Sequence, residues 1–159
     1  MSFDLHLAPA SGFLDWEDDR WNEFFERNPE SFELGKARYV GMVLDAIAHN
    51  LERGQLGSKF PLLARIDTED RVGWYNDEIS RLGAEIESIR DGLAALPISR
   101  STLGVEGDDE VQTLVHGLRA RDASSPPTSV HELFRYFFDT FQAAVSRASA
   151  TGQGLYATY

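Results

Sequence analysis

The feature that most constrains the fold is a run of apolar residues at helical spacing between Asn76 and Pro97. Apolar side chains recur there at steps of three or four, at Ile79, Leu82, Ile86, Ile89, Leu93 and Leu96. This period places them on one face of a helix, which ends at Pro97 because proline cannot continue the helical hydrogen bonds. The seam is too short for a typical coiled coil, so packing inside one domain is favoured over self-association.

Two other segments have the same period. The first runs from Ala37 to Arg53 and is followed by Gly54, a residue type that commonly ends helices in the left-handed conformation. The second begins after Ser129, and Glu132 completes the pattern of a capping box three residues later. The apolar face of this second helix is mostly aromatic and comprises Phe134, Phe137, Phe138, Phe141, Val145 and Ala148. The proline-rich stretch before it, Arg121 to Ser129, is typical of a surface loop.

Both ends of the chain have the pattern of strands. Between Ser2 and Ala8, apolar residues alternate with Asp4 and His6, which is the period of a strand with one buried face. Residues 155–159, LYATY, are β-prone and could pair with this first strand. We therefore expect an α+β fold, with several amphipathic helices packed on a small β-sheet that includes the N-terminal strand. The length of 159 residues suits one globular domain spanning 1–159.

Residues 50–61, NLERGQLGSKFP, combine glycine, serine and lysine as phosphate-binding loops do. Such a loop follows a strand, and four residues separate its first glycine from the Gly-Lys pair. Here Gly54 and Gly57 follow a predicted helix and stand too close together, and Ser58 precedes Lys59. The segment is therefore predicted to be a structural turn that leads into Phe60 and a short helix.

The charge of the chain is strongly negative. Fifteen Lys and Arg residues against 26 Asp and Glu residues give −11, a balance that repels nucleic acid and anionic membranes and attracts basic proteins. The acids concentrate in the N-terminal helical segment, where Trp16 lies among them as a candidate exposed aromatic anchor. The predicted partner-binding residues are Asp15, Trp16, Glu17, Asp18 and Asp19. Phe24 and Phe25 in the same segment are expected in the core.

Catalytic and metal-binding patterns are missing from the sequence. The chain has no cysteine and no Gly-x-Ser-x-Gly motif, and none of its four histidines has a second histidine at a ligand spacing. We therefore assign no catalytic residue, metal ligand or cofactor, and we expect a protein that is not an enzyme. The N-terminus lacks the basic and apolar regions of a signal peptide, and no apolar run is long enough to span a membrane, so a cytoplasmic location is expected.

Three blocks of the sequence carry a family resemblance: Val43 to Pro61, Asp77 to Pro97, and Ser129 to Gly152. In this order and spacing they resemble the immunity protein 70 family of bacterial polymorphic toxin systems. The residues that match the pattern of that family are Leu51-Glu52, Gly57, Phe60-Pro61, Glu85 with Ile89, and Tyr136-Phe137. The segments Ile66 to Tyr75 and Ile98 to Asp122 depart from the pattern, and the acidic N-terminal helix has no counterpart in it.

The resemblance implies a protein that binds and neutralises a cognate toxin by occluding its active surface. A toxin with a basic surface would suit the acidic charge of the chain. The alternative is a small-molecule-binding protein or small enzyme whose site is assembled from scattered residues such as His49, Trp74, Tyr75 and His116.

Overall fold

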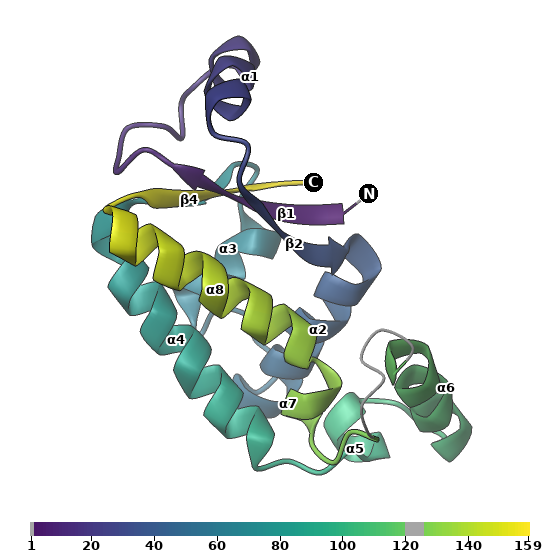
Figure 1. Cartoon of the computed structure of the whole chain (residues 1–159). Coiled ribbons are helices and arrows are strands. Elements are labelled where there is room, and N and C mark those ends of the chain that lie inside the picture. Colours follow the sequence, from purple (N-terminus) through teal and green to yellow (C-terminus); the bar gives the residue numbers. More distant parts are fainter. Residues whose placement is uncertain (1, 120–125) are drawn as a thin grey trace.

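The computed structural model describes residues 2–119 and 126–159, so the first part of the predicted loop at Arg121 to Ser129 lies outside the described residues. The fold is α+β, as expected, and the helices lie mainly on one side of a four-stranded sheet (Figure 1). The elements in chain order are β1 (Ser2–Ala8), α1 (Asp18–Arg27), β2 (Ser31–Lys36), α2 (Ala37–Leu51), α3 (Pro61–Thr68), β3 (Val72–Trp74), α4 (Asn76–Ala94), α5 (Arg100–Leu103), α6 (Asp108–Arg119), α7 (Val130–Leu133), α8 (Arg135–Thr151) and β4 (Gly154–Thr158).

The sheet joins the two ends of the chain. Its strand order is β2-β1-β4-β3 and every pairing is antiparallel, so the N-terminal and C-terminal strands are central neighbours. The edge strands β2 and β3 are not predicted by the sequence pattern. Each edge has a backbone carbonyl that accepts a hydrogen bond from a side chain: Gly73 from Arg65 at 3.0 Å, and Glu33 from the Tyr136 hydroxyl at 2.9 Å.

The inner face of the sheet packs on α8 and α4, which lie side by side beneath it in Figure 1. The aromatic stripe of α8 is buried as expected, and Phe141 contacts the edge of the Trp74 ring at a centroid distance of 5.6 Å. The predicted single helix after Ser129 is divided at Phe134, between α7 and α8. Only half of the expected capping box forms, because Glu132 accepts hydrogen bonds from Thr128 and not from Ser129.

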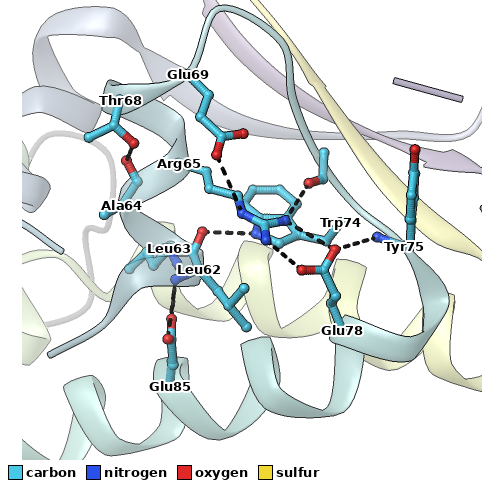
Figure 2. A network of polar contacts seen from close by, with 11 residues as sticks. Leu62, Leu63, Ala64, Arg65, Thr68, Glu69, Trp74, Tyr75, Glu78 and Glu85 are labelled. Atoms are coloured by element: carbon cyan, nitrogen blue, oxygen red, sulfur yellow. Dashed lines mark hydrogen bonds and ion pairs between the residues drawn. The ribbon is translucent and has the colours of Figure 1, made fainter. Parts of the chain in front are cut away.

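The start of α3 is held by two carboxylates from neighbouring helices. Glu52 lies at the end of α2, is 3% exposed, and accepts hydrogen bonds from the backbone N–H groups of Lys59 at 2.9 Å and Phe60 at 3.2 Å. Glu85 of α4 accepts from the N–H groups of Leu62 and Leu63 (Figure 2). Burial raises the pKa of Glu85, and these two backbone hydrogen bonds oppose the shift. The glycine-rich segment therefore does gather N–H groups around an anion, but the anion is a carboxylate of the protein itself.

On the other side of α3, Arg65 connects the helix to the sheet. Its guanidinium contacts the Glu78 carboxylate at 2.5 Å, and that hydrogen bond, more than any other cause, raises the pKa of Arg65 and lowers the pKa of Glu78. The indole N–H of Trp74 donates to the Leu62 carbonyl at 2.8 Å (Figure 2). Glu78 also accepts from the Tyr75 backbone N–H, so it caps α4, and the Asn76 side chain donates to the Gln153 carbonyl.

Replacing Glu52 tests the role of its carboxylate at the start of α3. We expect Glu52→Ala to lower the free energy of unfolding by about 3 kcal/mol, because two N–H groups at a buried site lose a charged acceptor. Glu52→Gln keeps one oxygen acceptor and should lose less. The matched control is Glu23→Ala, which removes an exposed ion pair and should change stability by less than about 0.5 kcal/mol. Urea unfolding measures all three, and an Ala variant as stable as the control would contradict this role.

Candidate partner-binding surface

The outer face of the sheet, opposite α4 and α8, divides into two rows of side chains that follow from the strand register. One row, which we call the covered row, contains Ser31, His6, Tyr156 and Gly73 from β2, β1, β4 and β3. The next row, which we call the bare row, contains Glu33, Asp4 and Thr158. Residues paired across strands lie on the same face, so each row is a continuous strip of surface.

Helix α1 lies over the covered row and is attached to it by aromatic rings. Trp21 stacks on Tyr156 with centroids 4.1 Å apart and an interplanar angle of 8°, and Phe25 lies 4.4 Å from the His6 ring. Phe13 is fully buried against Gly73, where a Cβ atom would lie 2.7 Å from the Phe13 ring. Figure 1 shows α1 standing above the sheet on the side away from the other helices. The helix is therefore held by side-chain stacking.

The acidic segment that precedes and opens α1 projects from this outer face. Asp15, Glu17, Asp18 and Asp19 are all exposed, and none of them takes part in an ion pair between the described residues. Asp18 and Asp19 lie in the first turn of α1, where the helix dipole favours negative charge. The backbone of the loop before α1 is held in place, because Arg71 donates hydrogen bonds to the carbonyls of Leu14 and Trp16. The carboxylates thus extend into solvent from a fixed backbone.

Trp16 differs from the expectation of an exposed anchor. The side chain is half-buried against the aromatic cluster of α1, with its ring centroid 4.8 Å from that of Trp21. The Arg20 guanidinium covers the ring at 4.0 Å from its centroid. Because a cation already occupies one face of the indole, Trp16 packs as part of the aromatic cluster and does not project into solvent as a free anchor. Phe24 and Phe25, which were expected in the core, are half-buried in the same cluster.

The residues named for a small-molecule site do not come together in a pocket that described residues line. Trp74 is fully buried in the main core, whereas His49 is exposed and contacts the Ser101 carbonyl at 2.5 Å. His49 lines two adjoining hollows of about 630 and 400 Å³ between α2 and α5, and neither His116 nor Tyr75 lines them. Within residues 2–119 and 126–159, no group of three or more His, Asp or Glu residues could hold a metal ion.

Comparison with known proteins shows the family. The model of the family described as immunity protein 70 matches residues 23–154. The chain belongs to the immunity protein 70 family. No curated protein and no solved structure is significantly similar to it. In this family member, no helix of the described residues is both long and apolar enough to cross a membrane.

The residues through which the chain resembles the immunity protein 70 family hold the fold together. Glu52 and Glu85 cap α3, Phe60 and Phe137 are buried, and Tyr136 binds the edge of β2. The acidic residues Asp15 to Asp19 precede the segment that the family model matches. Sequence reasoning missed the bare row, because its members come from three strands and only the register brings them together.

Removal of the Trp21 ring should release α1 while leaving the main core folded. We expect Trp21→Ala to speed amide hydrogen exchange in residues 19–27 by at least about a hundredfold, because the stack on Tyr156 is lost. Amides of α4 and α8 should exchange at the parent rate. Phe24→Ala, which shortens a half-buried ring of the same cluster, is the matched control and should have a smaller effect. If α1 of the Trp21 variant stays protected, the stack does not hold the helix.

Acid should weaken the attachment of α1 through His6. Burial lowers the pKa of His6, and the Asp4 carboxylate opposes this shift by raising it. The folded state therefore favours neutral His6, so its contribution to stability is complete above the ordinary pKa of about 6.5 and is lost as the pH falls below it. Urea unfolding at pH 7.5, 6.5 and 5.5 should show a steeper loss for the parent than for His6→Gln. Equal losses in both proteins would contradict this assignment.

Proposed function

We propose that this protein is an immunity protein that binds a cognate bacterial toxin and neutralises it by covering the active surface of the toxin. The observation that supports the proposal most is the family match over residues 23–154. Such a protein acts by binding and needs no chemistry of its own, so we propose that it is not an enzyme. It would act as one globular domain in the cytoplasm, where an incoming toxin reaches its target.

The chemistry of the outer face supports a basic partner. Asp15 and Glu17 lie on the loop that Arg71 holds, and Asp18 and Asp19 open α1 directly after it. None of these four carboxylates is paired with a described residue, and the net charge of the chain is −11. Fixed surface charge of one sign attracts an oppositely charged protein over distance and speeds its association. The same charge repels nucleic acid, so we propose a protein partner and no nucleic-acid partner. The aromatic cluster beneath the loop keeps these charges in place.

Protection of cells is the direct test of the function. The polypeptide encoded next to this protein is produced in a host with and without it, and growth is compared. Protection, together with a one-to-one complex of the two purified proteins, is the expected result. If the protein neither protects nor binds, the proposal is wrong. A small molecule that raises the Tm would then favour the alternative, a ligand-binding protein that uses the hollows beside His49.

Charge reversal locates the interface. Replacement of Asp15, Glu17, Asp18 and Asp19 by Lys should raise the Kd for the toxin at least about tenfold at low salt, mainly through slower association. The salt dependence of binding should fall as well, because fewer opposite charges remain to be screened. Surface plasmon resonance over a series of salt concentrations measures both quantities.

A matched control reverses four acids elsewhere: Glu87, Asp91, Asp109 and Glu110. These residues are exposed, and two of them open α6 as Asp18 and Asp19 open α1, so net charge and helix-dipole effects are equal in the two variants. The control should bind the toxin nearly as well as the parent does. Equal losses in both variants would show that only net charge matters and would place the contact elsewhere.

A further inference from the structure

We propose that the bare row of the outer sheet face, Glu33, Asp4 and Thr158, is a second docking surface for the same toxin and receives a Lys- or Arg-bearing segment of it. This inference rests on the proposed function and names the part of the surface that would contact cationic side chains directly. Three observations support it: a missing cover, a like-charge pair, and the charge of the chain.

The bare row has no covering element. The rings of α1 contact His6 and Tyr156 of the neighbouring row, and Figure 1 shows no helix of the described residues above the ends of β1 and β4 near the two termini. Glu33 is exposed, and Asp4 and Thr158 are half-buried. A sheet with one face packed commonly leaves the other face to solvent, so exposure alone does not identify a docking surface. The chemistry of the row does.

Asp4 and Glu33 form a like-charged pair across two strands. They are direct partners in the register of β1 and β2, which places their Cβ atoms about 5 Å apart on the same face. Neither carboxylate takes part in an ion pair between described residues. The same sheet carries His6, which hydrogen-bonds to Thr158 at 2.8 Å, and Lys36 at the end of β2. Such a pair destabilises the free protein, and an incoming cation would relieve it.

The two most exposed large hydrophobic side chains in the described part of the chain lie on the other side of the sheet. Tyr159 directly follows Thr158, so its ring points to the inner face, where it contacts Phe3 with centroids 4.8 Å apart. Tyr136 belongs to α8 beneath the sheet, and its hydroxyl donates to the Glu33 carbonyl at the edge of β2. The bare row therefore offers two carboxylates and a hydroxyl, which suit an Arg or Lys side chain of a basic protein segment.

Other occupants fit the row less well. A chain of charge −11 repels nucleic acid and disfavours a second copy of itself. Strand addition at β2 would displace the Tyr136 hydroxyl from the Glu33 carbonyl. The row lies on the same outer face as α1, because its members share β1 and β4 with His6 and Tyr156. One basic partner could therefore contact the acidic segment and the bare row together.

The test is a double neutralisation, Asp4→Asn with Glu33→Gln. If the like-charged pair serves binding, the double variant should be more stable than the parent and should bind the partner more weakly. We expect the Tm of the free protein to rise by about 1–3 °C, because the repulsion disappears. The Kd for the purified polypeptide encoded next to this protein should rise at least about tenfold. The matched control is Glu87→Gln with Asp91→Asn on α4, which should leave the Kd unchanged.

The outcomes separate this inference from the proposed function. Opposite changes in Tm and Kd, with an unchanged control, support the bare row as a docking surface. If the double variant binds and protects as well as the parent does, the row is not a docking surface while the immunity function stands. If the parent itself neither binds nor protects, both proposals are wrong.

Discussion

The capping of α3 by Glu52 and Glu85 is the interaction on which the rest of the helical layer depends. The first N–H groups of a helix have no acceptor within that helix, and here Glu85 of α4 accepts from those of Leu62 and Leu63. Glu52, directly after α2, accepts from the N–H groups of Lys59 and Phe60 just before α3. These contacts position three helices relative to one another. They also place Leu62 and Arg65 of α3 beside β3, where the Leu62 carbonyl accepts from Trp74 and Arg65 donates to Gly73. The β3 edge of the sheet is therefore held in place by the same helix, α3.

Much of this fold could be predicted from the sequence, because the residues that recur at helical or strand spacing in long segments are the ones that the structure buries. The face of α4 that Ile79, Leu82 and Ile86 form is fully buried, and the two terminal strands pair as expected. The short edge strands could not be predicted. β3 has three residues, all buried, so no alternation is present to detect. In β2, adjacent residues Leu34 and Gly35 are both buried because the pairing with β1 shifts between Phe3 and Asp4, and this breaks the period of two.

The candidate site was less predictable than the fold, for a physical reason. Charged residues in a polar segment are nearly always exposed, so the exposure of Asp15 and Glu17 followed from composition. Trp16 is half-buried because it packs against the rings of α1 and because Arg20 lies over its indole. The sequence spacing does not indicate these contacts. The pairing of Asp4 with Glu33 depends on the register of two strands, and the register is fixed partly by a bulge that the sequence pattern does not indicate.

The structure separates residues that form the fold from residues that are free to meet a partner. The residues that resemble the family act beneath the sheet or at its edge, where changes would leave N–H groups unpaired or create cavities. The outer face differs, because α1 is attached there through stacked rings. The carboxylates of Asp15, Glu17, Asp18 and Asp19 make no ion pairs with the described residues. Substitutions of those carboxylates therefore alter charge without disturbing the core. A scaffold of this kind can keep one fold while the charge of its outer face changes.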